Sequence, residues 1–311
     1  MDYIVSGYAY PTISQESLDW WLPRVSRICS FCYGFNGKGE ITGIDDGRLV
    51  AAANAAKVKP MMVLAPMDSS GMFSDEAARM VFDNEEARHK LISGIEKTIK
   101  DKGFAGIDFD FEYLNGSYAE DYARFVGDVR NLIKPEGYIT SVALAPKTSS
   151  FQKGILYEGH DYSAMGEAAD YCLLMTYEWG FAFGPPMAVA PLNNVREVVE
   201  YALTEIPSEK VLLGMNNYGY DWKLPFEDGK TRAETLTNYQ AEARAQYYGA
   251  EIKYDDKAQA PFYNYKDSTG AEHLVWFENE RSWQSRLSLV KEYGLAGIGI
   301  WTIMSIFYGG I

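Results

Sequence analysis

Short runs of apolar and β-branched residues recur along the chain and alternate with segments of helical periodicity. We expect eight strands, which cover residues 3–10, 27–35, 61–66, 106–112, 139–145, 171–177, 211–216 and 297–303. A strand–helix alternation of this kind implies parallel strands joined by right-handed crossovers. Eight such strands predict an α/β fold, the closed (β/α)₈ barrel, with an open doubly wound sheet as the alternative.

Four of the intervening segments have clear helical spacing of their apolar residues. They cover residues 87–99, 118–133, 195–204 and 282–293. Gly103 and Gly294 follow two of them as expected C-caps, and Pro135 and Pro207 end the other two. These helices lie between predicted strands, as the barrel requires.

One long polar stretch interrupts this alternation between the seventh and eighth strands. It covers approximately residues 223–280 and is rich in Tyr, Asp and Lys. It is too long for a single strand-to-helix connection and contains both helix-like and strand-like pieces. We therefore expect one barrel domain, residues 1–311, with a small α+β insertion inside it.

The composition narrows the possible partners. The chain has 311 residues, 29 Lys plus Arg and 43 Asp plus Glu, so its net charge is −14. Nucleic acids and anionic membrane surfaces need cationic patches, so neither is an expected partner. Aromatic residues make up 14% of the chain, a composition that suits flat apolar ligands such as sugars and also suits a plain core.

The sequence gives no sign of membrane insertion or export. Its apolar runs stay well below the roughly 20 residues of a membrane helix. The first residues read as a strand and lack the basic and apolar regions of a signal peptide. The compartment is left open by the sequence.

Cys29 and Cys32 form a C-x-x-C pair, which can carry redox or zinc chemistry. Residues three apart on a strand point to opposite faces. The chain has only three Cys and three His in all. We therefore expect buried, reduced thiols.

The chemically informative segment is the fourth strand, where three acids alternate with two phenylalanines. Asp108, Asp110 and Glu112 share one face, and Phe109 and Phe111 share the other. Since the aromatic face suits the helix layer, the acids should point into the barrel. A solvated edge strand is the alternative arrangement.

Buried stacked acids repel one another and lose hydration, which raises their pKa values. The outermost, Glu112, is suited to act as a general acid, with Asp110 and Asp108 tuning its pKa. A Mg²⁺ or Ca²⁺ site is the competing reading. The three carboxylates spread over roughly 13 Å of strand, too far for all to bind one ion. We expect no metal and no cofactor.

This segment resembles the D-G-x-D-x-D-x-E signature of family 18 glycoside hydrolases, which are (β/α)₈ barrels. The chain departs from the signature at the first Asp, where it has Ala105, which alternation places on the outward face. Residues 175–178, Met-Thr-Tyr-Glu, resemble the M-x-Y-D motif, with Glu in place of Asp. Trp301 matches the Trp that forms the floor of the sugar site.

Within the family, several segments resemble the sporulation-type catalytic domains. They are residues 175–179, 184–186, 190–192, 218–222 and 291–301. Those enzymes are similar to N-acetylglucosaminidases that degrade spore-cortex peptidoglycan. The chain departs from them by lacking wall-binding repeats and by having Asn216 and Asn217 where Pro and an apolar residue are common.

The resemblance implies a retaining, substrate-assisted hydrolysis in which the 2-acetamido group of the sugar is the nucleophile. Glu112 would be the acid and base, Asp110 would orient the acetamido N–H, and Tyr177 would donate to its oxygen. Asp108 would support Asp110 from below. The sugar would be bound by Glu178 and Trp301, with Tyr10, Tyr33, Trp179 and Tyr218 as further candidates for the groove.

The expected substrate is a glycan containing β-linked N-acetylglucosamine, from spore-cortex peptidoglycan or a chitin-like polymer. A chitinase, an endo-enzyme acting on N-glycans and a non-catalytic lectin are the alternatives. The last is disfavoured because Glu112 and Asp110 are both present. The sporulation-type resemblance would place the protein in the cell envelope or spore, and otherwise it would be cytoplasmic. Exo or endo action, protein partners and oligomeric state are not determined by the sequence.

Overall fold

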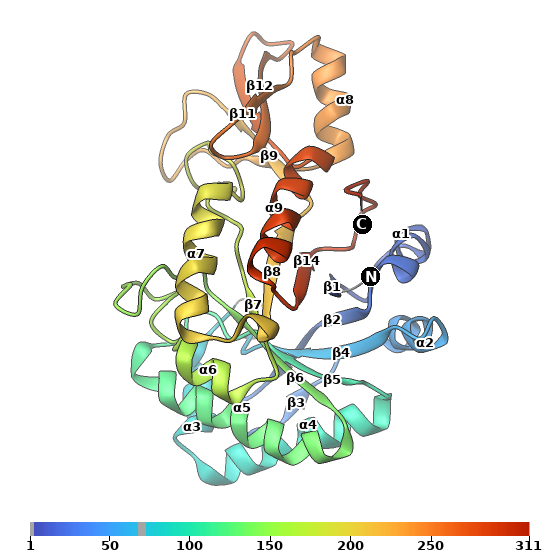
Figure 1. The fold of residues 1–311 in the computed structure, drawn as a ribbon, viewed down its shortest axis with the longest axis vertical. Helices are drawn as coiled ribbons and strands as arrows, with labels where there is room; N and C mark the ends of the chain where they lie inside the picture. Colours follow the sequence, from blue (N-terminus) through green and yellow to red (C-terminus); the bar gives the residue numbers. More distant parts are fainter. Residues whose placement is uncertain (1–2, 68–72, 311) are drawn as a thin grey trace.

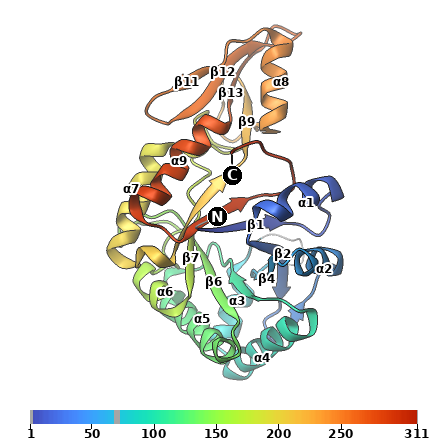
Figure 2. The ribbon, with the colours of Figure 1, turned by 45° about the vertical axis from the view of Figure 1, so that its right-hand side comes forward.

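The computed structural model describes residues 3–67 and 73–310 of the chain. Within them, eight parallel strands form a closed barrel, because β1 pairs with both β14 and β2 (Figures 1 and 2). In their order around the barrel the strands are β1 (Ile4–Ala9), β2 (Arg27–Phe35), β4 (Lys59–Leu64), β5 (Gly106–Phe109), β6 (Ile139–Leu144), β7 (Tyr171–Leu174), β8 (Val211–Asn216) and β14 (Gly297–Trp301). The predicted (β/α)₈ barrel is confirmed.

Helices cover the outside of the barrel, as Figure 2 shows. They are α1 (Gln15–Trp21), α2 (Gly47–Ala55), α3 (Asp75–Phe82), α4 (Glu85–Lys102), α5 (Ala119–Ile133), α6 (Tyr162–Ala168), α7 (Leu192–Glu205) and α9 (Glu280–Tyr293). The left-handed glycines Gly103 and Gly294 end α4 and α9, as the sequence predicted.

Alternation along the strands divides the core into two layers. Outward residues pack against the helices, whereas inward residues form a separate cluster in the barrel. The buried members of this interior cluster are Tyr8, Cys29, Phe31, Met61, Val63, Ala143, Leu173, Met175 and Leu212. The barrel is therefore filled at its lower end, and its site must lie at the carboxyl ends of the strands.

An irregularity in β2 breaks this alternation. The pairing register between β2 and β4 shifts between Ser30 and Tyr33. Cys29 and Cys32 consequently both pack against the interior cluster, and the prediction that they point to opposite faces is wrong. Both are free thiols, Cys29 buried and Cys32 partly buried.

A second sheet stands above the barrel, at the top of Figure 1. It is antiparallel, in the order β10 (Glu234–Thr237), β9 (Tyr218–Lys223), β13 (Glu272–Trp276), β12 (Ala260–Lys266) and β11 (Lys253–Asp255). Helix α8 (Asn238–Tyr248) packs on it through Ala241 and Ala245. This α+β unit begins at Tyr218, five residues before the start that the sequence analysis assigned to the insertion.

Buried polar contacts fasten this insertion to the barrel. Arg286 of α9 pairs with Glu278, which follows β13, at 2.6 Å between Nη1 and Oε2, and neither side chain is exposed. Arg286 also donates through Nε to the carbonyl of Ala190 (3.0 Å), before α7. On the entry side, Trp283 of α9 donates to the carbonyl of Asn216 at the end of β8 (2.7 Å). Both connections of the insertion are thus held by α9.

No helix in the described residues is both long and apolar enough to cross a membrane.

Replacement of Arg286 by Met should lower the free energy of unfolding by about 3–5 kcal/mol, because Glu278 would be left buried without its cation. Urea denaturation followed by circular dichroism measures this loss. The control is Arg196→Met, because Arg196 pairs with Glu292 at the surface. This variant should lose less than about 1 kcal/mol of unfolding free energy. Similar small losses in both variants would contradict the proposed fastening.

Candidate active site

The acidic segment runs from the interior of the barrel to its upper rim. Asp108 and Asp110 are buried inward, while Phe109 and Phe111 are buried in the helix layer. Regular pairing of β5 stops at Phe109, so the predicted strand is three residues too long. Even so, the alternation persists beyond the strand, and Glu112 lines a cavity together with Asp110.

Asp108, the deepest acid, is held by two hydroxyl groups. Tyr8 donates to Oδ2 at 2.7 Å, and Ser141 donates to Oδ1. Burial raises the pKa of Asp108 to about 6, although these hydrogen bonds and the charge of Arg27 oppose the rise. Its oxygens point to partners below the cavity, so it supports the acids above it.

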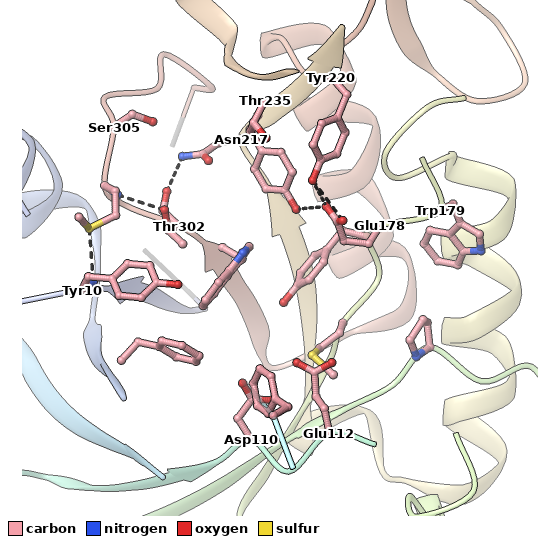
Figure 3. A pocket seen from close by; sticks show the side chains of 18 of the residues that line it. Tyr10, Asp110, Glu112, Glu178, Trp179, Asn217, Tyr220, Thr235, Thr302 and Ser305 are labelled. Carbon is pink, nitrogen blue, oxygen red and sulfur yellow. Dashed lines mark hydrogen bonds between the residues drawn. The ribbon is translucent and has the colours of Figure 1, made fainter. Parts of the chain in front are cut away.

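Asp110 lies at the floor of the cavity, beside Glu112 (Figure 3). Burial, followed by the charges of Glu112 and Asp108, raises the pKa of Asp110 well above its ordinary value. Its Oδ1 is buried and has no hydrogen-bond partner among the described residues. An unmet buried polar atom costs about 1–3 kcal/mol, which a bound ligand can offset.

Glu112 has the electrostatics of a general acid. Burial and then the nearby charge of Glu178 raise its pKa to about 7. A carboxyl with that pKa is substantially protonated at neutral pH and can donate its proton to a leaving group. Burial thus suits Glu112 to proton donation at neutral pH, whereas an exposed glutamate would already be ionised.

Glu178 follows β7 in the left-handed backbone region, with φ of 66°, which is uncommon for a residue with a side chain. Its carboxylate accepts hydrogen bonds from two hydroxyls of β9, Tyr218 at 2.5 Å and Tyr220 at 2.9 Å (Figure 3). Burial raises the pKa of Glu178, although the hydrogen bonds from the two phenols oppose the rise. Two hydroxyl donors favour the ionised form.

Aromatic side chains line the cavity opposite Glu178. Trp301, at the end of β14, makes edge contacts with Phe31 (4.8 Å between ring centroids) and Tyr10 (6.1 Å). Figure 3 places Tyr10 on one side of the cavity and Glu178 and Trp179 on the other. Flat apolar surface on one side and carboxylates on the other suit a sugar ring, which has apolar faces and a polar edge.

The cavity has a volume of about 870 Å³, enough for several sugar rings. Eight of the ten predicted site residues line it, namely Tyr10, Asp110, Glu112, Tyr177, Glu178, Trp179, Tyr218 and Trp301. Asp108 lies beneath them. The tenth, Tyr33, does not reach the cavity.

Tyr33 was expected at the groove because it lies near the end of a predicted barrel strand. The register shift in β2 turns it outward instead, where its hydroxyl donates to Asp46 and accepts from Lys102 (2.6 Å). It is buried in the helix layer. Its assignment to the groove is therefore wrong.

Several lining residues were missed by the sequence analysis. Phe31 lies in the middle of β2, and Asn217 directly follows β8. Thr235, Leu236 and Gln240 come from the insertion. Alternation on β2 could have indicated Phe31. Nothing local in the sequence indicates that β10 and the start of α8 lean over the barrel, since this depends on tertiary packing.

Ala105 also lies where alternation does not predict it. It precedes β5 and packs against the interior cluster rather than in the helix layer.

Within the described ranges, no group of three His, Cys, Asp or Glu side chains is arranged to hold a metal ion.

The family profile described as Glycosyl hydrolases family 18 matches residues 40–305. The chain therefore belongs to family 18 of the glycosyl hydrolases. The class predicted from the acidic segment, O-glycosyl hydrolase, is confirmed by this assignment.

Relatives resemble the chain along most of its length. The cortical fragment-lytic enzyme of Bacillus subtilis (strain 168) is 41% identical over 281 residues, which are 90% of this chain and 65% of the relative. The putative sporulation-specific glycosylase YdhD of the same organism is 31% identical over 96% of this chain and 71% of its own. The chain spans 60–65% of the three cortical fragment-lytic enzymes it matches.

Among solved structures, the spore cortex-lytic enzyme SleL of Bacillus cereus has a TM-score of 0.95 at 35% identity. The match covers 99% of this chain and 72% of that one. The predicted resemblance to the sporulation-type branch of the family is confirmed.

Glu112→Gln should stabilise the protein in alkaline solution, because the pKa of Glu112 is about 7 in the native state and 4.5 ordinarily. The native state then binds this proton more tightly than the unfolded chain, so stability falls between about pH 4.5 and pH 7. The glutamine variant escapes that loss. We expect it to be about 1–3 kcal/mol more stable than the wild type near pH 8, with a smaller gap near pH 4.

Urea denaturation at the two pH values measures the difference. The control is Glu120→Gln, because Glu120 is exposed on α5 and should change stability by less than about 0.5 kcal/mol at either pH. A gap for Glu112→Gln that does not widen with pH would contradict the raised pKa.

Proposed function

We propose that this protein is a retaining glycoside hydrolase that cleaves β-linked N-acetylglucosamine in spore-cortex peptidoglycan. The observation that carries the proposal is the pairing of two acids at the cavity floor. Glu112 has a proton available at neutral pH, and beside it Asp110 has a buried oxygen without a partner. The N–H of an acetamido group is a donor from which this oxygen could accept a hydrogen bond.

In the first step, Glu112 protonates the glycosidic oxygen, and the bond from that oxygen to the anomeric carbon breaks. The carbonyl oxygen of the 2-acetamido group forms a new bond to the anomeric carbon and gives an oxazolinium ion. Asp110 accepts a hydrogen bond from the acetamido N–H and stabilises the positive charge of the oxazolinium ion. Tyr177, which lines the same cavity, donates to the acetamido oxygen.

In the second step, water attacks the anomeric carbon while the Glu112 carboxylate takes its proton. The bond to the acetamido oxygen breaks, and the two inversions retain the configuration. Preorganised groups facing the developing charge are the effective part of such a site. Glu178, fixed by Tyr218 and Tyr220, would bind sugar hydroxyls, and Trp301 would stack beneath the ring.

The choice of cortex as substrate rests on the relatives. The Bacillus subtilis relative is named a cortical fragment-lytic enzyme, and the Bacillus cereus structure is described as a spore cortex-lytic enzyme. Tyr218 and Tyr220, the partners of Glu178, belong to residues 218–222, one of the segments that resemble this branch.

Incubation with purified cortex fragments should release products that end in a reducing N-acetylglucosamine. Borohydride reduction followed by mass spectrometry identifies them as N-acetylglucosaminitol ends. Muramitol ends, or no turnover of cortex fragments, would contradict the proposed substrate. Faster cleavage of chitin oligomers would favour a chitinase instead.

The matched control for this assay is Glu112→Gln, which keeps the shape of the side chain without its titratable proton. Turnover should fall by about 10²–10⁴, the range for loss of a general acid, while binding of the fragments persists.

A further inference from the structure

The general acid lies beyond the regular part of its strand. β5 ends at Phe109, and the last ladder-type bond of this segment in the described chain joins the N–H of Asp110 to the carbonyl of Leu64 (3.0 Å). Tyr113, after the acid, has a left-handed φ of 58°. Such a conformation persists only where surrounding contacts impose it. The position of Glu112 therefore depends on contacts outside the sheet.

A buried histidine supplies such a contact. His160 is 1% exposed, and its Nε2 lies 2.8 Å from the carbonyl oxygen of Phe111, the residue before the acid. Its Nδ1 accepts the N–H of Ala145, which directly follows β6, also at 2.8 Å. One imidazole ring thus joins the ends of β5 and β6.

The partners of His160 determine its tautomer. Because the backbone N–H of Ala145 can only donate, Nδ1 must carry the lone pair and Nε2 the hydrogen. Nε2–H then donates to the carbonyl of Phe111. Burial lowers the pKa of His160 to about 4, so the ring is neutral when Glu112 is poised to react.

The backbone around His160 is itself held in place. The Nζ of Lys147 donates to the carbonyl of His160 at 2.8 Å. Tyr162 donates to the carbonyl of Ala145 and accepts the N–H of Lys147 (3.0 Å). These bonds are buried and hold the backbone at His160 in place. The imidazole can therefore fix the position of the segment that follows β5.

The carbonyl held by His160 belongs to the same peptide plane as the nitrogen of Glu112. The ring of Phe111 is fixed on the other side, stacked on Tyr122 at 4.8 Å between centroids. With the ring and the carbonyl of Phe111 both fixed, the following side chain has one direction, into the cavity. If the bond were lost, the buried carbonyl would need another donor, and the peptide plane would rotate to find one.

We propose that His160 is a positioning residue for the reaction, which orients the carboxyl of Glu112 by holding the carbonyl of Phe111. This inference rests on the proposed function, because it assigns His160 a part in proton transfer by Glu112. His160 touches neither substrate nor the reacting atoms, and it is not among the residues that line the cavity.

Two substitutions separate the bonds of the ring. In His160→Asn the amide oxygen can replace Nδ1 and accept from Ala145, but the side chain is too short to reach Phe111. In His160→Gln the amide nitrogen can replace Nε2 and donate to Phe111. Since misplacement of a catalytic group by about 1 Å can cost 10²-fold, we expect H160N to lower kcat by ~10–100-fold.

The kinetic assay uses an aryl β-N-acetylglucosaminide oligomer. For H160N, KM should stay within about threefold of the wild type, since the sugar contacts are intact. H160Q should recover kcat to within about fivefold of the wild type. The matched control is His89→Asn, at an exposed position on α4, which should leave both constants unchanged.

Equal losses of kcat in H160N and H160Q would overturn the inference, because a purely structural role does not distinguish the two bonds. Wild-type kcat in a folded H160N would also overturn it. If H160N does not fold, H160Q still decides, since a folded H160Q that has lost more than tenfold in kcat contradicts the proposal. A wild-type enzyme inactive on every N-acetylglucosaminide would instead refute the proposed function.

Discussion

Three carboxylates withdrawn from water in a single row impose the central constraint on this molecule. Burial raises the pKa values of Asp108, Asp110 and Glu112, and repulsion within the row adds to the rise for Asp110. The upper two acids, Asp110 and Glu112, therefore hold protons at a pH where exposed carboxyls are ionised, and the charge of each influences the titration of the other. Tyr8 and Ser141 satisfy the deepest acid, which leaves the upper two free to act on a ligand.

The insertion is part of this electrostatic arrangement. Its first strand supplies Tyr218 and Tyr220, which hold Glu178, and the charge of Glu178 is in turn a cause of the raised pKa of Glu112. The insertion can act in this way only if it is fixed to the barrel, which the buried pair of Glu278 and Arg286 provides. Stability of that connection and acidity at the site are thus linked.

The sequence predicted the fold and the centre of the site because both follow from local patterns. Alternation alone placed Asp108 and Asp110 inward and Phe111 outward, and it held beyond the end of β5. Tyr33 lies near a strand end, as expected, but it packs in the helix layer because an irregularity in β2 changes the facing of the later side chains of that strand. His160 was not predicted either, because its role depends on contacts with Phe111 and Ala145 that no spacing reveals.

In the proposed mechanism Glu112 acts as the acid and Asp110 as a hydrogen-bond acceptor, and the substrate supplies the nucleophile. The most direct test compares aryl oligosaccharides of equal length that differ only in the 2-substituent of the cleaved sugar. With a 2-acetamido group we expect turnover. With a 2-hydroxyl group we expect binding without turnover, since no oxazolinium ion can form. A comparable kcat on both would mean that a protein carboxylate is the nucleophile, and it would contradict the assignment of Asp110 and Glu112.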